Sequence, residues 1–340
     1  MYEALTYDDV LLVPQFSDIR SREEVKLTTS LSDSISFDLP IIASPMDSVT
    51  GEETASVMHQ NGGISVIHRY NTIEDQAKII SSLRDKHSNN IKVGGAVGVT
   101  GDYIERAIAL YLAGASFICI DVAHGHSILM KEALINLRTK FPKGFHIMAG
   151  NVATLEGFND LADWGADSIR CNIGGGSICT TRIQTGHGVP GLETIFQCAR
   201  SDRSAKIIAD GGIKNAGDIV KALAAGADAV MLGSLLAGTT ESPAKMFKSS
   251  DGTLRKEYRG MASAEAQIAW RGKVGSLEGV AHSVPFRGPL KDILDDLEKG
   301  IRSGLSYSGA RSILELQATA QWVRQSAASQ IESTAHIRNK

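Results

Sequence analysis

Short apolar runs alternate with helical segments along most of this chain. The segments between the runs place apolar residues at helical spacing, as in TIEDQAKIISSLRDK (72–86) and NAGDIVKALAAG (215–226). Apolar strands joined by helical crossovers indicate a parallel sheet covered on both faces, and eight units predict a closed (β/α)8 TIM barrel of the α/β class. A doubly wound open sheet is the alternative. The eight runs cover residues 39–44, 63–68, 92–99, 117–124, 145–151, 167–175, 205–212 and 228–234.

The segments on either side of the barrel are read as additions to a single domain over residues 1–340. Residues 1–38 are predicted to form an irregular capping segment, and the chain after residue 234 is long enough for an added loop and for helices over 286–328. Two amphipathic stretches, 291–307 and 312–326, are expected to pack on the barrel exterior. The last dozen residues are expected to be disordered. No Pro-, Ser- or charge-rich linker marks a second domain.

Composition narrows the class of protein. The chain is 43% hydrophobic and 21% charged, with a formal net charge of -3 and a pI near 6.3. Such a balance gives no bulk attraction for nucleic acid or for an anionic membrane. The amino terminus lacks a signal-peptide pattern, and no long uninterrupted apolar stretch occurs. Four cysteines without metal or disulfide spacing are typical of a reducing compartment, so we expect a cytoplasmic protein.

The last two predicted strands end in glycine-rich loops. ADGGI contains Asp210 and Gly212, and LGSLL contains Gly233 and Ser234. Glycines let backbone N–H groups approach a phosphate, and TIM barrels commonly bind phosphate at these two loops. Asp210 is well placed for ribose hydroxyls. Tight turns without a ligand are the alternative interpretation.

The loop after the sixth predicted strand, CNIGGGSICTTR (171–182), places Cys179 just after three consecutive glycines. A cysteine on such a loop is a candidate nucleophile, because Arg182 and the backbone N–H groups of the turn would stabilise its thiolate. Cys119 and Cys198 lie in apolar segments and are read as structural, and Cys171 is left open. Another phosphate-binding barrel with an incidental loop cysteine remains an alternative.

Together with TGHGVP (185–190), this loop resembles the catalytic cysteine loop of the IMP dehydrogenase and GMP reductase family. The resemblance extends over nearly the whole chain, and the known barrel fold of that family agrees with the count of eight strands. Similar motifs are YDDVLLVP (7–14), SPMDSVT (44–50), GGISVIH (62–68), IDVAHGHS (120–127), AGNVAT (149–154), EYRGMAS (257–263), EGV (278–280) and IRSGLSYSGA (301–310).

The resemblance implies specific roles in a reaction on a purine nucleoside monophosphate. Cys179 would attack C2 of the purine, while Thr181 and Glu278 would assist the proton transfer. Met46 would lie against the base and Asp210 would hold the ribose. The other implied substrate contacts, those to the phosphate first, are Ser177, Gly212, Gly233, Ser234, Tyr258, Gly260, Met261 and Gly279. Several of these residues also have ordinary structural interpretations: a solvated Glu278, a turn-capping Thr181 and a packed Tyr258.

The resemblance also implies a nicotinamide cofactor, a cation and an oligomer. Asp121, Val122, Ala123 and Asn151 would line the nicotinamide site, although Asp121 and Asn151 could simply cap helices. Backbone carbonyls of Gly174, Gly176 and Cys179 would bind a monovalent cation such as K⁺. A homotetramer is expected, with no nucleic-acid or membrane partner.

The family contains two main activities, and the resemblance favours GMP reductase. IMP dehydrogenase oxidises C2 with NAD and hydrolyses the cysteine adduct with a flap that carries an Arg-Tyr pair. GMP reductase displaces ammonia from GMP and then uses NADPH to form IMP. In this chain the flap segment, about 260–285, is short up to Glu278 and contains Trp270-Arg271 instead of that pair. No room follows the second strand for the paired regulatory (CBS) modules of most dehydrogenases, and IDVAHGHS and VIHRY are closer to reductase motifs.

Some positions depart from the family pattern. The cysteine loop has Asn172 and Gly175 where the family commonly shows a glycine and a proline. SPMDSVT, and EGV with VPFRGP (284–289), look more like the dehydrogenase. The alternatives are therefore a reductase of a deoxy or modified guanine nucleotide, an IMP dehydrogenase with Arg271 as its flap arginine, and a noncatalytic nucleotide-binding barrel.

Overall fold

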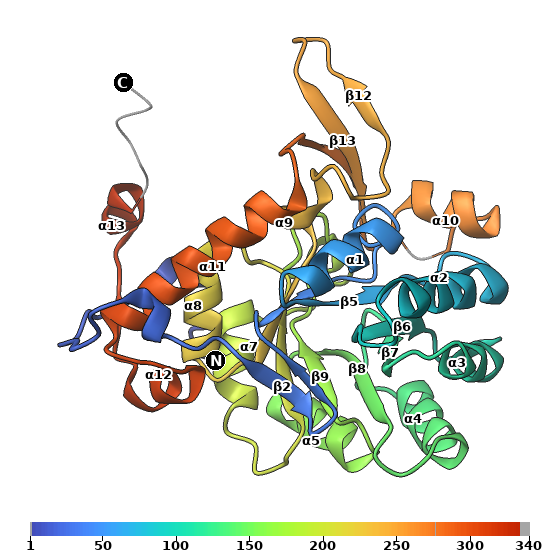
Figure 1. Ribbon diagram of the computed structural model, residues 1–340, viewed down its shortest axis with the longest axis horizontal. Coiled ribbons are helices and arrows are strands. Elements are labelled where there is room, and N and C mark those ends of the chain that lie inside the picture. Colours follow the sequence, from blue (N-terminus) through green and yellow to red (C-terminus); the bar gives the residue numbers. More distant parts are fainter. Residues whose placement is uncertain (1, 276, 334–340) are drawn as a thin grey trace.

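The computed structural model describes residues 2–275 and 277–333, and its centre is a closed barrel of eight parallel strands (Figure 1). The first barrel strand pairs with the last, with Ile42 opposite Met231, which excludes the open-sheet alternative. All eight predicted runs are confirmed as strands. In chain order they are β4 (Ile41–Ala43), β5 (Ile64–Ile67), β6 (Val93–Val97), β7 (Phe117–Asp121), β8 (His146–Val152), β9 (Ser168–Cys171), β10 (Lys206–Asp210) and β11 (Ala229–Leu232).

Helices surround the barrel because each helical segment follows a strand and presents an apolar face to it. Their starts are set by side-chain caps: Thr72, Ser127, Thr154 and Asn215 each accept a hydrogen bond from the first turn of a helix. The helices are α1 (Glu52–Gln60), α2 (Ile73–Lys86), α3 (Tyr103–Leu112), α4 (Ile128–Lys140), α5 (Leu155–Asp163), α6 (Thr181–Thr185), α7 (Gly191–Cys198), α8 (Ala216–Ala224), α9 (Ser234–Ala237) and α11 (Leu290–Tyr307).

The amino-terminal segment closes one end of the barrel with a regular hairpin. Strands β2 (Thr29–Ser32) and β3 (Ile35–Phe37) pair in antiparallel fashion, and Leu31, Ile35 and Phe37 are buried in one cluster with barrel-interior side chains. The prediction of a capping segment is right, but the prediction that it is irregular is wrong. Thr29 bonds to the carbonyl of Asp228, which precedes β11, so the hairpin covers the amino-terminal ends of the strands. The opposite end is left for the site.

The chain after β11 makes a second small sheet beyond the barrel. Strands β12 (Met246–Lys248), β13 (Leu254–Arg259) and β14 (Ala281–Pro285) pair in that order and project from the barrel in Figure 1. Helix α10 (Ala264–Arg271) lies between β13 and β14 in sequence. The predicted flap segment therefore consists of this short helix, a loop and strand β14.

The carboxy-terminal prediction is partly wrong. Helix α11 is present, but the helix expected over 312–326 ends early, as α12 (Ile313–Thr319). The following strand β15 (Trp322–Arg324) pairs with β1 (Val10–Leu12) near the other terminus, a partner that local periodicity does not reveal. Helix α13 (Ala327–Glu332) reaches into the tail predicted to be disordered, and residues 334–340 of that tail lie outside the described residues. Two 3-10 turns, Tyr7–Asp9 and Arg22–Glu24, complete the terminal segments.

Candidate active site

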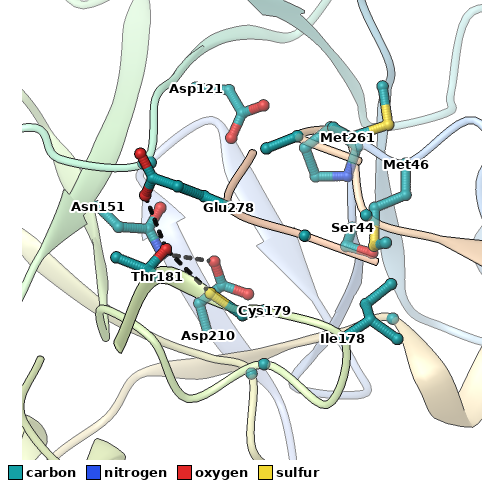
Figure 2. Close-up of a pocket in the computed structure, with 18 of the residues that line it drawn as sticks. Ser44, Met46, Asp121, Asn151, Ile178, Cys179, Thr181, Asp210, Met261 and Glu278 are labelled. Atoms are coloured by element: carbon teal, nitrogen blue, oxygen red, sulfur yellow. Dashed lines mark hydrogen bonds between the residues drawn. The ribbon is translucent and has the colours of Figure 1, made fainter. Parts of the chain in front are cut away.

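A cavity of about 290 Å³ lies at the carboxyl ends of the barrel strands (Figure 2). A second cavity, of about 270 Å³, is lined by residues of the cysteine loop and of the two glycine-rich loops. The loops that follow different strands meet here, as expected for a TIM barrel. Three predicted phosphate contacts, Ser177, Gly212 and Ser234, line the second cavity. The other predicted site residues line the first cavity: Met46, Asp121, Val122, Ala123, Asn151, Gly174, Gly176, Cys179, Thr181, Asp210, Gly233, Tyr258, Gly260, Met261, Glu278 and Gly279.

Cys179, Thr181 and Glu278 form a chain of hydrogen bonds (Figure 2). The Cys179 thiol donates to Thr181 Oγ1 over 3.2 Å, and that hydroxyl donates to Glu278 Oε2 over 2.8 Å. Thr181 is buried at the start of α6. These contacts offer a proton on the thiol a direct route to a carboxylate. Thr181 was alternatively expected to cap a turn and Glu278 to be a solvated surface residue. Instead, the two side chains are hydrogen-bonded to each other beside the Cys179 thiol.

Backbone pairing holds Glu278 at this place although it is 97 residues from Thr181. The Thr180 N–H donates to the Glu278 carbonyl over 3.0 Å, and the Val280 N–H donates to the Ile178 carbonyl over 3.1 Å. Cys179 and Gly279 thus face each other as a bridge between antiparallel segments. The segment that closes the flap therefore sets the position of the carboxylate relative to the thiol.

The other cysteines are not candidates for this chemistry. Cys119, Cys171 and Cys198 are buried, and burial raises the pKa of Cys119 to about 12. The structural reading of Cys119 and Cys198 is confirmed, and Cys171, which was open, is buried as well. Cys179 is half-exposed. Arg182, expected to stabilise its thiolate, instead donates to the Val189 carbonyl.

Arg170 is a site residue that the sequence reasoning missed. It lies inside β9, and its guanidinium reaches Asp121 on one side and Asp210 on the other, 2.8 Å from Asp210 Oδ2. Burial would lower the pKa of Arg170, but Asp210 and then Asp121 outweigh it and hold the pKa well above its usual value. Asn151 Nδ2 also donates to Asp210 Oδ2, over 2.8 Å. The Arg170 guanidinium therefore links Asp210, the expected ribose contact, to Asp121, the expected nicotinamide contact.

The predicted phosphate contacts come together around Tyr258. Burial raises the pKa of Tyr258 to about 12, against the opposing effect of the neighbouring Ser177 and Ser234 hydroxyls. A side chain at Gly233 would begin 3.0 Å from the Tyr258 oxygen and 3.1 Å from the Met46 sulfur, so both atoms would have to give way to it. The result is a cradle of hydroxyl groups and glycine backbone that suits a phosphate.

Two loops hold Met261, a predicted substrate contact, near Met46, the predicted base contact (Figure 2). The Tyr70 hydroxyl donates to the Met261 carbonyl over 2.7 Å, and the Asp47 N–H points at the Met261 sulfur over 3.4 Å. The Tyr70 ring stacks on Trp270 with centroids 6.2 Å apart. Helix α10 is thereby docked on the loop after β5. Tyr70 ends the VIHRY motif noted in the sequence, but it was not predicted as a site residue.

Comparison with known proteins agrees with this geometry. The family model described as "IMP dehydrogenase / GMP reductase domain" matches residues 4–336. The chain belongs to this family. Inosine-5'-monophosphate dehydrogenase from Nitrosopumilus maritimus is 34% identical over 469 aligned positions, and GMP reductase from Leishmania major is 33% identical over 477, each alignment covering 98% of this chain and 98% or 97% of the relative. Both alignments are longer than the 340 residues here, so these relatives contain additional segments.

The solved structures contain a similarly close match. A cysteine-to-alanine variant of GMP reductase from Trypanosoma brucei, solved in complex with guanosine 5'-monophosphate, superposes with a TM-score of 0.91. It is 31% identical, and the match covers 99% of this chain and 98% of that one. Relatives of both names are thus equally near, and the comparisons establish an oxidoreductase family that uses a nicotinamide cofactor without separating the two activities.

The residues expected to hold the nicotinamide fit that group. Asn151 Oδ1 is buried and has no hydrogen-bond partner among the described residues, while Nδ2 of the same side chain is bonded to Asp210 and to the Asn172 carbonyl. A free acceptor beside Asp121 suits the N–H groups of a carboxamide. Arg69, whose guanidinium donates to the Asp121 carbonyl over 3.3 Å, also lines this part of the cavity.

The monovalent-cation site remains a prediction. No group of three or more His, Cys, Asp or Glu side chains within residues 2–275 and 277–333 could hold a metal ion. The Gly176 carbonyl already accepts the Cys179 N–H over 3.1 Å, and a carbonyl oxygen has a second lone pair to offer. Among the same residues, no helix is both long and apolar enough to cross a membrane.

Proposed function

We propose that this protein is a GMP reductase that converts GMP to IMP and ammonia with NADPH. The observation that carries the proposal is the Cys179–Thr181–Glu278 chain beneath a short flap. In this proposal the thiol attacks C2 and the carboxylate receives its proton through one hydroxyl. Relatives named IMP dehydrogenase are equally close in sequence, so similarity does not choose between GMP and IMP as the substrate. The residues of the flap have to supply that argument.

The first step forms a bond between Cys179 Sγ and purine C2. As it forms, the thiol proton passes to Thr181 Oγ1 and the Thr181 proton passes to Glu278. Glu278 then returns a proton through Thr181 to the 2-amino group, the C2–N bond breaks, and ammonia leaves. When bound, NADPH supplies the hydride that C2 takes up. The C2–Sγ bond then breaks and leaves IMP and a thiolate that takes a proton from solvent.

The position of the flap supports the reductase over the dehydrogenase. Hydrolysis of the cysteine adduct needs a base near C2, and the candidate for that role was Arg271. Its guanidinium lies over the Tyr70 ring, 5.9 Å from the ring centroid, at the far end of α10 from Met261. An arginine held on an aromatic face is well placed to dock the helix and poorly placed to activate water.

Two assays test the proposal and separate it from the alternatives. With GMP and NADPH we expect oxidation of the cofactor with release of one ammonia per turnover, and none of this in Cys179→Ala. Reduction of NAD with IMP would select the dehydrogenase instead, and preference for dGMP would select the deoxynucleotide reductase. With no reaction for any pair, the protein is a nucleotide-binding barrel without this activity.

A mass measurement tests the covalent step by itself. GMP alone, without NADPH, should add its purine nucleotide to Cys179 with loss of ammonia, because the attack precedes the use of the cofactor. IMP alone should leave the protein mass unchanged. We further propose NADPH in preference to NADH, a monovalent cation at the cysteine loop, a homotetramer and a cytoplasmic location.

A further inference from the structure

Asn172 occupies an unusual backbone conformation at the start of the cysteine loop. Its φ is +152°, in the region that glycine adopts freely and other residues avoid. The residue is 4% exposed and lines both cavities of the site. A strained, buried residue between two binding cavities points to a role that its side chain performs.

The Asn172 side chain ties the cysteine loop to the neighbouring glycine-rich loop after β10. Its Nδ2 donates to the Gly211 carbonyl over 3.2 Å, while its own backbone carbonyl accepts from Asn151. The two loops touch through their backbones: a Cβ on Gly211 would lie 3.4 Å from the Gly176 nitrogen and Cα. The bond from Asn172 therefore spans a close contact between the loop that carries the nucleophile and the loop expected to bind phosphate.

Gly175 provides the space that the Asn172 carboxamide fills. A Cβ on Gly175 would lie 2.3 Å from Asn172 Nδ2 and 2.6 Å from its Oδ1, well inside van der Waals contact. The carboxamide has little room to move away, since a Cβ on Gly191 would lie 3.1 Å from the same nitrogen. A side chain at 172 and a side chain at 175 thus compete for one volume. Asn172 and Gly175 are the two departures from the family pattern noted in the sequence. Because the Asn172 side chain fills the space beside Gly175, the two departures are structurally linked.

We propose that Asn172 and Gly175 act together as a positioning pair that fixes the cysteine loop, a role that rests on the proposed function only in taking Cys179 as the nucleophile. Asn172 touches neither the thiol nor the relay. It acts through its steric contact with Gly175, which precedes the residue whose carbonyl accepts the Cys179 N–H. The carboxamide takes the place of a stiffer residue at 175 and links the loop to Gly211.

A double-mutant cycle tests the pairing. The variants are Asn172→Gly, Gly175→Ala and the double variant, each measured for kcat, for KM of the nucleotide and for the rate of Cys179 alkylation by iodoacetamide. We expect Gly175→Ala to lower kcat and the alkylation rate by about tenfold, because its methyl group displaces the loop. In the double variant the methyl group finds free space, so both rates should lie closer to wild type than in Gly175→Ala.

A matched cycle provides the control. A Cβ on Gly176 would lie 3.4 Å from Cys179 Cβ and is not directed at Asn172. The effect of Gly176→Ala should therefore be the same with Asn172 present or replaced by glycine. The pairing is wrong if the fold-changes of Asn172→Gly and Gly175→Ala simply multiply in the double variant. It is also wrong if Gly176→Ala is coupled to Asn172→Gly as strongly as Gly175→Ala is.

Folding and activity can be separated within the same set. If Gly175→Ala fails to fold, the double variant should fold with a melting temperature near wild type, and failure of both would overturn the pairing. Alkylation of Cys179 needs no nucleotide, and the other three cysteines are buried. A coupled alkylation rate without turnover of GMP would therefore contradict the proposed function and leave the positioning pair standing.

Discussion

Replacing Arg170 by methionine should destabilise the protein strongly, because it leaves two carboxylates together without their cation. Arg170 is 8% exposed, and its partners Asp121 and Asp210 are 18% and 14% exposed. Removing one member of a buried ion pair costs about 3–5 kcal/mol. The two carboxylates keep some contact with solvent and Asp210 keeps its bond from Asn151, so we expect about 3 kcal/mol, at the lower end of that range.

Lysine at position 170 should have an intermediate effect. It keeps the charge but loses the planar fork that reaches Asp121 and Asp210 at once. Loss of one charge-assisted hydrogen bond costs about 1.5 kcal/mol, and we expect a loss of free energy of unfolding of that order. The order wild type, Arg170→Lys, Arg170→Met should appear both in urea unfolding followed by tryptophan fluorescence and in the melting temperature.

Arg203 offers a matched control on the surface. It also contacts two carboxylates, Asp163 and Asp202, but at an exposed position. Arg203→Met should leave the unfolding midpoint unchanged, since exposed ion pairs contribute little. The reasoning is refuted if Arg170→Met unfolds at the wild-type urea concentration, or if the Arg203 variant loses as much stability.

Three further predictions concern the relay, the phosphate cradle and the barrel interior. Thr181→Val should lower kcat by about 10²–10⁴-fold with little change in KM, and a kcat near wild type would rule out the hydroxyl relay. Tyr258→Phe should raise KM for the nucleotide by about tenfold while kcat changes little, and an unchanged KM would remove Tyr258 from the phosphate site. Burial lowers the pKa of His146 to about 4, so the folded protein holds this ring neutral. Because the unfolded chain takes up the proton near pH 6.5, stability should fall as pH falls, by about 1.4 kcal/mol at pH 5.5. His146→Gln should flatten urea midpoints measured between pH 7 and pH 5, and an equal slope in both proteins would contradict the assignment.

The barrel could be read from the sequence because its strands are buried on both faces. Such strands appear as continuous apolar runs, so local pattern alone locates them. The hairpin of β2 and β3 and the strand β15 could not be found in this way. Each has only three or four residues, and β15 exists because β1 lies beside it, more than 300 positions away along the chain. Pairing between distant segments leaves no trace in local periodicity.

The site residues also fall into those that a local motif reveals and those that depend on contacts between distant segments. Cys179 and the glycine-rich loops carry local motifs, and they were predicted. Arg170 carries none, although a charged residue inside an apolar strand was a usable signal, since such a charge is rarely buried without partners. Tyr70 and the Asn172–Gly175 contact depend on which loops meet at the top of the barrel. They become visible only when the strands are placed in space.

The choice between the two activities follows from what approaches C2 after the cysteine bond has formed. The nucleophile and Arg170 belong to the barrel, while Tyr258 of the hydroxyl cradle lies on β13 of the added sheet, and none of the three distinguishes the two reactions. Glu278 and α10 belong to the flap, but they have different surroundings. Glu278 accepts a hydrogen bond from Thr181, whereas Arg271 at the end of α10 lies over the Tyr70 ring. In the proposed function, a site that moves a proton to the leaving amine, and whose flap arginine lies on Tyr70, favours loss of ammonia over addition of water. Moving that arginine, by replacing Tyr70 and Trp270 together, would release α10 without adding a base, so hydrolysis of the adduct should still not appear.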